Sequence, residues 1–143
     1  MPNLRFVIAW IVSAIVMYSA FYCWHGILSN DFYKIQYPKG IFMLFSALVY
    51  IVISFVLTKI FEHKRIHKKI KNLHLRALVV GSVFGFLLFA ITSVIGIGFS
   101  NPYSVEILIV DLIWQITEQT LGAFIVAFAH IFIFAPDFEE ERN

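Results

Sequence analysis

The stretch FVIAWIVSAIVMYSAFYCWHGILSN, residues 6–30, contains no Asp, Glu, Lys or Arg. Three further stretches of this kind follow, at residues 40–58, 77–105 and 119–136. The hydrocarbon core of a bilayer needs about 20 apolar helical residues to cross it, and each stretch reaches that length or nearly does. Only helices and closed barrels satisfy their backbone groups in lipid. The sequence therefore predicts transmembrane helices at about residues 6–27, 41–61, 77–99 and 104–135.

The composition of the chain agrees with a membrane protein. Of its 143 residues, 60% are apolar and 14% are charged, whereas about a quarter of an ordinary soluble domain is charged. This balance excludes a soluble globular domain. We expect a single transmembrane domain over residues 1–143, with no cofactor and no nucleic-acid partner.

The positive charges predict the orientation of the chain. Seven of them flank or occupy the connection between the second and third helices: Lys59, Lys64, Arg65, Lys68, Lys69, Lys71 and Arg76. Because cytoplasmic loops carry the excess of Lys and Arg, this connection is expected inside the cell. The predicted fold class is thus an all-α integral membrane four-helix bundle, up-down-up-down, with both termini cytoplasmic. The predicted location is the cell inner membrane of a bacterium.

The basic segment at residues 62–76 predicts a helix that lies on the membrane surface. Ile66, Ile70 and Leu73 form an apolar stripe, and basic amphipathic helices of this kind bind anionic lipids. The residues expected to contact the inner leaflet are Lys64, Arg65, Lys68, Lys69 and Lys71. Three histidines share the segment, but the surrounding positive charges oppose a metal ion, so no metal site is expected.

Two glycines on the third predicted helix indicate close helix packing. Gly81 and Gly85 are four residues apart, and small residues at this spacing let two backbones approach in lipid. The partner helix belongs either to the same chain, to a second copy in a homo-oligomer, or to another membrane protein.

The fourth predicted helix carries the polar side chains that point to a function. Asp111, Gln115 and Glu118 share one face, and charged groups in lipid are costly unless they face the bundle, pair, or reach water. Tyr18, Tyr22 and His25 offer matching polar groups on the first helix. The residues expected to line an outward-facing polar pocket are Tyr18, Tyr22, His25, Tyr50, Asp111, Gln115 and Glu118.

Such a pocket is suited to binding or translocating a small cation or a protonatable solute. In the alternative interpretation, the same residues form an interfacial hydrogen-bond network that holds the first and fourth helices together. The protein would then act as an accessory or assembly factor through helix–helix and lipid-surface contacts. An enzyme is disfavoured, because the chain has no phosphate-binding glycine loop, no nucleophile elbow and no H-E-x-x-H motif.

Several short motifs resemble a family of bacterial four-helix membrane proteins of unknown function. They are Trp24 and Gly26 followed by Phe32-Tyr33, then Gly81 and Gly85, and Val110-Asp111-Leu112 with Trp114. The resemblance implies the same fold and location, and no established activity. The family carries further acidic residues on the first and third helices, where this chain has Phe21 and Ser93.

Overall fold

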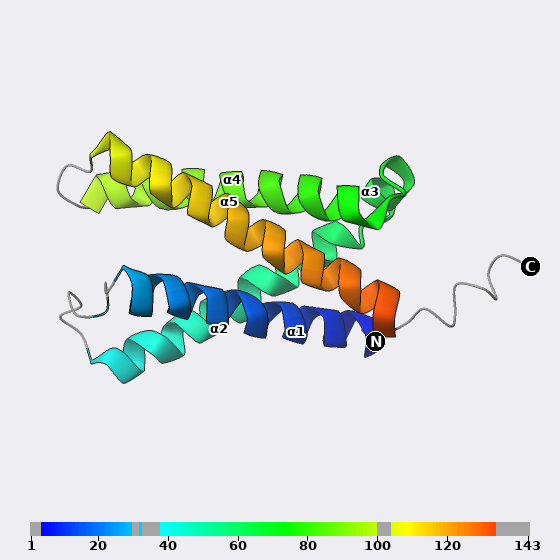
Figure 1. The fold of residues 1–143 in the computed structure, drawn as a ribbon, viewed down its shortest axis with the longest axis horizontal. Coiled ribbons are helices and arrows are strands. Elements are labelled where there is room, and N and C mark those ends of the chain that lie inside the picture. Colours follow the sequence, from blue (N-terminus) through cyan, green and yellow to red (C-terminus); the bar gives the residue numbers. More distant parts are fainter. Residues whose placement is uncertain (1–3, 30–31, 33–37, 100–103, 134–143) are drawn as a thin grey trace, which may run out of the picture.

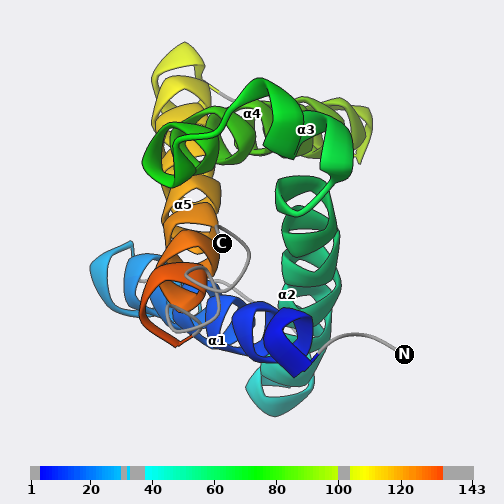
Figure 2. The same cartoon turned by 90° about the vertical axis from the view of Figure 1, so that its right-hand side faces the viewer.

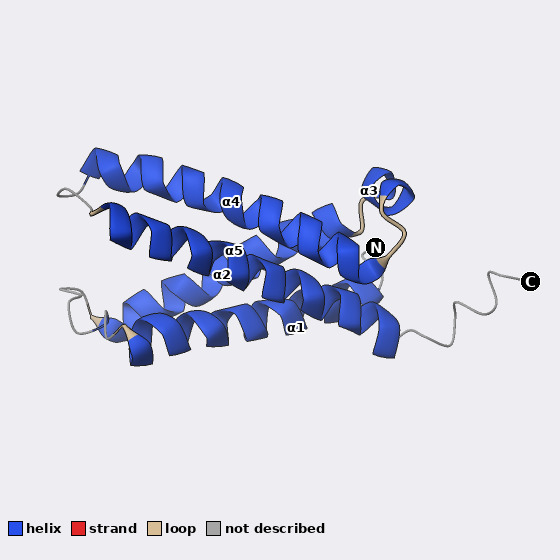
Figure 3. Cartoon of the chain, turned by 45° about the horizontal axis from the view of Figure 1, so that its top comes forward, coloured by secondary structure: helices blue, strands red, loops and turns tan. Residues whose placement is uncertain are grey.

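The computed structural model of the protein describes residues 4–29, 32, 38–99 and 104–133. Within these ranges every regular element is a helix (Figure 3). The long helices are α1 (Leu4–Phe21), α2 (Lys39–Phe61), α4 (Leu73–Phe99) and α5 (Val105–Phe128). Two of them continue as short π-helices, α1 into η1 (Tyr22–Leu28) and α5 into η3 (Ala129–Ile133). The short helix α3 (Lys64–Lys69) connects α2 to α4.

The long helices run alternately in opposite directions (Figure 1). The beginning of α1, the end of α5 and the helix α3 therefore all lie at one end of the bundle. In the part of the chain that the structure describes, four helices are long and apolar enough to span a membrane. The predicted all-α membrane bundle is confirmed.

Viewed along the bundle, the long helices form the sides of a square (Figure 2). α4 packs along α5, α5 packs against α1, and α1 packs against α2. The contacts of α2 with α4 and with α5 are less extensive. α1 and α4 consequently lie on opposite sides, and α5 connects them.

α5 is the most protein-embedded of the candidate spans. Inside the structure, 39% of its most hydropathic window is buried, against 17% for α2 and for α4. It is also the least apolar of these spans, with a mean hydropathy of 1.3. The two properties belong together, because a polar helix face is stable in a bilayer only where other helices cover it. On α5, Glu118 and Gln119 are the polar residues that the protein shields in this way.

Small side chains allow the helices to approach closely around α5. A side chain at Gly122 would overlap Met17 of α1 and would lie 3.1 Å from Leu57 of α2. Ala123 and Ala127, also on α5, are fully buried in the same core. In lipid there is no hydrophobic driving force that brings helices together. Helix association therefore depends on close packing, which small residues permit.

The basic segment differs from the continuous surface helix expected over residues 62–76. α3 ends at Lys69, and α4 already begins at Leu73, so Arg76 belongs to α4. Asn72 causes the break, because its side-chain oxygen accepts hydrogen bonds from the backbone N–H groups of His74, at 2.9 Å, and Leu75, at 3.2 Å. An asparagine in this position starts a new helix.

Candidate functional site

Two polar residues occupy the middle of the span formed by α5 and η3. Glu118 and Gln119 lie at the centre of the range Val105–Phe132, and their side chains are 1% and 0% exposed. A carboxyl group and an amide group are therefore enclosed by protein at the middle of a candidate membrane span. Polar residues in this position are expensive and are typically functional.

Glu118 forms a side-chain hydrogen bond with Tyr50 of α2. Tyr50 is buried, and its ring packs 6.1 Å from the ring of Tyr18 and 5.2 Å from that of Phe21. The second carboxyl oxygen of Glu118, Oε1, has no hydrogen-bond partner among the described residues. One half of this carboxyl group is thus available to a further partner.

Gln119 has unused hydrogen-bonding groups at both ends of its amide. Neither Oε1 nor Nε2 has a partner in the described part of the chain. Glu118 meets α2, and the hydroxyl oxygen of Thr120 lies 3.3 Å from Ser82 Oγ of α4. Successive helical residues are about 100° apart around the axis, so Gln119 points between these two directions. Gln119 therefore faces the interior of the bundle.

The hydroxyl groups around these residues are already satisfied. Ser13 Oγ donates to the carbonyl oxygen of Gly122 at 3.0 Å, Ser54 Oγ donates to that of Trp10 at 2.8 Å, and Thr58 Oγ1 donates to that of Ser54 at 2.8 Å. Their bonds tie α1 to α5 and α1 to α2. In the middle of α5, Glu118 Oε1 and both amide atoms of Gln119 lack a hydrogen-bond partner among the described residues, and Trp114 Nε1 is in the same state one turn away. We call Tyr50, Glu118 and Gln119 the central polar cluster.

The structure brings together part of the predicted pocket. Tyr50 bonds to Glu118, and Tyr18 packs on Tyr50 while its hydroxyl donates to the carbonyl oxygen of Met43 at 3.2 Å. His25 packs against Phe21, with ring centroids 5.0 Å apart.

The remaining predicted residues lie outside the central polar cluster. Tyr22 is exposed and packs on Phe32 instead. Asp111 and Gln115 are half-buried on α5, between the cluster and the end of the bundle opposite α3.

An aromatic pair lies one helical turn from Glu118 on its outer side. Trp114 of α5 stacks on Trp24 of η1, with centroids 4.4 Å apart and planes inclined by 9°. Residues four apart lie on the same side of a helix, so Trp114 is on the face that carries Glu118. The stacked pair joins η1 to α5 one turn from Glu118, at the end of the cluster where the sequence alone predicts an open pocket.

Gly81 and Gly85 lie at the contact between α4 and α5. A side chain on Gly81 would overlap the backbone of Thr120, and one on Gly85 would lie 2.8 Å from Ile116 Cα. The close packing expected of these glycines therefore occurs within this chain.

Gln119 was missed by sequence reasoning. The four-three-four spacing of Asp111, Gln115, Glu118 and Gly122 selects the neighbouring face, and Gln119 lies about 100° away from it. A usable signal did exist, since glutamine is uncommon in a span unless it faces protein.

Comparison with known proteins identifies a family. The model of the 7 transmembrane receptor (Secretin family) matches residues 1–125. The chain belongs to this family. No curated protein and no solved structure matches significantly.

The family match covers the first three candidate spans and most of the fourth. The family is named for seven membrane helices, and the described part of this family member contains four candidate spans. The match and the helices together confirm a multi-pass membrane protein. They do not show the finer resemblance to bacterial four-helix proteins, which stays a prediction.

Proposed function

We propose that the protein binds a small protonated solute at the central polar cluster. The observation that carries this proposal is the set of unpartnered buried atoms, Glu118 Oε1 with Gln119 Oε1 and Nε2. Leaving such a group without a partner costs about 1–3 kcal/mol each. A ligand that satisfies all three removes that cost, which makes the cluster a binding site within the bundle.

The chemistry of the three atoms favours one class of solute. A carboxylate oxygen and an amide oxygen both accept hydrogen bonds, whereas the amide nitrogen donates. A bare metal ion would satisfy the oxygens and leave Nε2 unpaired. The described residues also contain no group of three acidic, histidine or cysteine side chains that could hold a metal ion. A protonated amine that carries its own oxygen acceptor, such as an amino alcohol, would satisfy all three atoms.

The solute would enter from the end of the bundle opposite α3, the predicted outside. Asp111, Trp114 and Gln115 lie on α5 along this direction, and Trp114 stacks on Trp24. Separation of the two rings would open the route to Glu118. The proposed site therefore opens outward and is lined by Tyr18, Tyr50 and Glu118.

The test is the effect of solutes on the thermal stability of the purified protein. Ethanolamine binds the folded state and should raise Tm, because a ligand at a hundred times its Kd stabilises by about 2.7 kcal/mol. Ethylamine, which lacks the oxygen acceptor, should raise Tm less, and sodium ions should raise it least.

The variant E118Q should lose the response to ethanolamine. E106Q is the matched control, because Glu106 is an exposed residue in the first turn of the same helix, and it should keep the response. An equal shift of Tm in E118Q and in the unchanged protein would refute a solute site at Glu118.

The family match favours a second candidate, a receptor function. A transporter would carry labelled ethanolamine into sealed vesicles. A receptor would bind it without uptake and would change the hydrogen exchange of α3 and its flanking residues at the other end of the bundle. Absence of any response to the solutes would leave the accessory or assembly role, in which helix contacts and the lipid-facing lysines act alone.

A further inference from the structure

An apolar groove lies where α2, α3 and α4 meet, at the end of the bundle that carries the basic residues. Its volume is about 240 Å³, below the about 300–1,000 Å³ of typical small-molecule pockets. The groove is lined by Ile60, Ile66, Lys69, Ile70, Val79, Val80, Val83, Phe84 and Leu87. All of these except Lys69 are apolar, so the groove suits a hydrocarbon chain.

The groove runs along α4, parallel to the direction in which the acyl chains of a membrane lipid extend. Its wall on α4 extends from Val79 to Leu87, which is about 12 Å at a rise of 1.5 Å per residue. Val79, Val83 and Leu87 are exposed, so this wall is open to the surrounding acyl chains. In Figure 2, α3 lies over the corner between α2 and α4. The groove therefore follows the membrane helices and is covered by α3 at the membrane surface.

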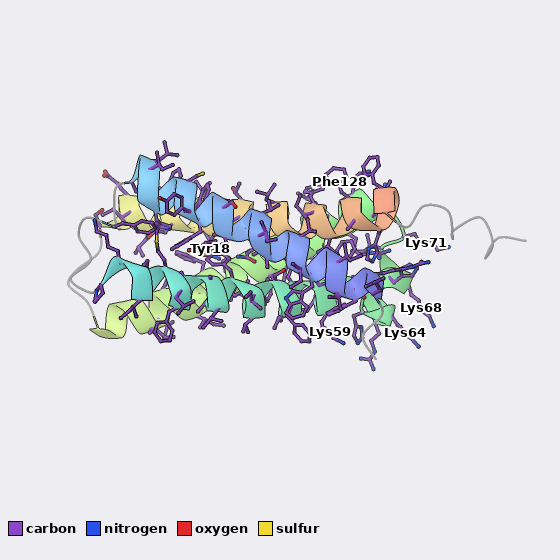
Figure 4. All side chains as sticks on the ribbon, turned by 90° about the horizontal axis from the view of Figure 1, so that it is seen from below. Tyr18, Lys59, Lys64, Lys68, Lys71 and Phe128 are labelled. Atoms are coloured by element: carbon purple, nitrogen blue, oxygen red, sulfur yellow. The ribbon has the colours of Figure 1, made fainter. Side chains whose placement is uncertain are left out.

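Positive charge is placed at the covered end. Lys69 is the last residue of α3 and the one charged residue in the groove lining. Lysines gather at this end of the bundle, as Lys59, Lys64, Lys68 and Lys71 show in Figure 4. An ammonium group on a flexible stem at this depth meets lipid phosphates.

A buried guanidinium group adjoins the same groove. Arg76 is 2% exposed, and its Nε donates to the carbonyl oxygen of Ile70 at 3.0 Å. Ile70 lines the groove, and so does Val80, one turn along α4 from Arg76. Arg76 Nη2 has no hydrogen-bond partner among the described residues. The guanidinium carbon also lies 5.2 Å from the ring centroid of Phe61, so Arg76 contributes positive charge from behind the groove wall and does not line the groove.

We propose that the groove is a specific site for one anionic phospholipid. One acyl chain lies along α4 between Val79 and Leu87, and the phosphate lies at Lys69 on the side of Arg76. This differs from general adsorption of a basic helix to an anionic surface, because it requires the groove as well as the charge. The apolar lining selects a lipid, and Lys69 with Arg76 selects its negative headgroup.

The experiment is native mass spectrometry of the full chain in detergent, titrated with phosphatidylglycerol or phosphatidylcholine. We expect one phosphatidylglycerol molecule bound more tightly than the rest, and weaker binding of phosphatidylcholine. K69Q should weaken the tight site about fivefold, the effect of about 1 kcal/mol per lysine. V83W should fill the groove and remove the tight site.

Matched controls separate the site from general adsorption. Lys64 lies on the same helix as Lys69 but does not line the groove, so K64Q should bind as the unchanged protein does. Val94 is 74% exposed on α4, away from the groove, so V94W should bind normally.

Three outcomes would overturn the proposal. They are equal losses in K64Q and K69Q, unchanged binding in V83W, and equal affinity for the two lipids. Inorganic phosphate should not displace the lipid, because the acyl chain supplies the apolar contacts. Displacement by phosphate would show an anion site without a lipid.

Discussion

At the scale of the residue, Gln119 is a buried polar side chain that lowers the stability of the folded protein. Its amide is fully buried, and both ends of the amide lack a hydrogen-bond partner within the described structure. Burial of an unpaired polar group is unfavourable. The neighbouring Glu118 shares the cost at one oxygen, although its other oxygen is bonded to Tyr50.

The residue-scale prediction is that Q119L stabilises the protein and removes solute binding. Leucine fills a similar volume without the unpaired groups, so the free energy of unfolding should rise by about 1–3 kcal/mol. Thermal unfolding in detergent, with and without ethanolamine, measures both effects. Q115L, a change of the same type at a half-buried position on the same helix, should alter stability little. Destabilisation by Q119L would mean that the amide is satisfied in the folded state.

At the scale of the element, the pairing of α4 with α5 depends on backbone contact. Gly81 lies against the backbone around Thr120, where neither helix has a flexible side chain that could move aside. Ser82 and Thr120 add a hydroxyl contact of 3.3 Å beside it. This contact fixes the rotation of α5, and through it the direction in which Gln119 and Glu118 point.

The element-scale prediction is that G81A weakens the contact between α4 and α5. The added methyl group must push the backbones apart, and overpacking of this kind costs about 1–3 kcal/mol. Thermal unfolding should show a lower Tm, and the ethanolamine response should weaken because the cluster loses its alignment.

G40A provides the control for this substitution. Gly40 lies at the start of α2 with no atom within 4 Å of an added Cβ, so alanine is tolerated there. If G81A were as stable as G40A, the two helices would have room to repack, and the rigid contact would be wrong.

At the scale of the whole molecule, charge and apolar surface together predict how the bundle sits in a membrane. The basic residues gather around α3 at one end, as the labelled lysines show in Figure 4. The opposite end carries the aromatic residues of η1. The positive-inside rule predicts that the basic end is cytoplasmic and that η1 forms the outer end of the first span.

The single cysteine of the chain tests this orientation directly. Cys23 is exposed in η1, so a membrane-impermeant maleimide should label it in intact cells. In a C23S/K68C double variant the thiol is moved to α3, and labelling should require permeabilised cells. The reverse pattern would invert the predicted topology and would make the proposed solute route a cytoplasmic one.

The spans were predictable from the sequence because crossing a bilayer depends on a local sum. About 20 apolar residues in succession suffice, whatever the rest of the chain does, and the structure contains a helix at each of these stretches. Ser46, Tyr50, Ser54 and Thr58 of α2 recur at four-residue spacing in the sequence, and all of them except the half-buried Ser46 are buried in the structure. The break in the basic segment was not predicted, because it results from helix capping by Asn72 and not from the pattern of charges.

The structure places some of the predicted site residues together, and their role at a site stays a prediction. Glu118 and Tyr50 follow from the rule that a polar group in a span must face protein, and the structure pairs them. Tyr22 is exposed, and Gln119 takes a central place that its sequence neighbours do not indicate. Which side chains meet depends on the rotation and crossing of every helix in the bundle.

The amino-acid sequence by itself determined that this is a helical, multi-pass membrane protein and which of its residues are too polar to face lipid. Only the tertiary structure decided that Glu118 meets Tyr50, that Gln119 faces the interior, and that α2, α3 and α4 leave a groove beside Lys69. The physical reason is the range of the interactions. The free energy of transfer into lipid is a sum over the residues of one helix. Contacts between helices depend instead on close packing of residues far apart in the sequence, as at Gly81, Gly85 and Gly122.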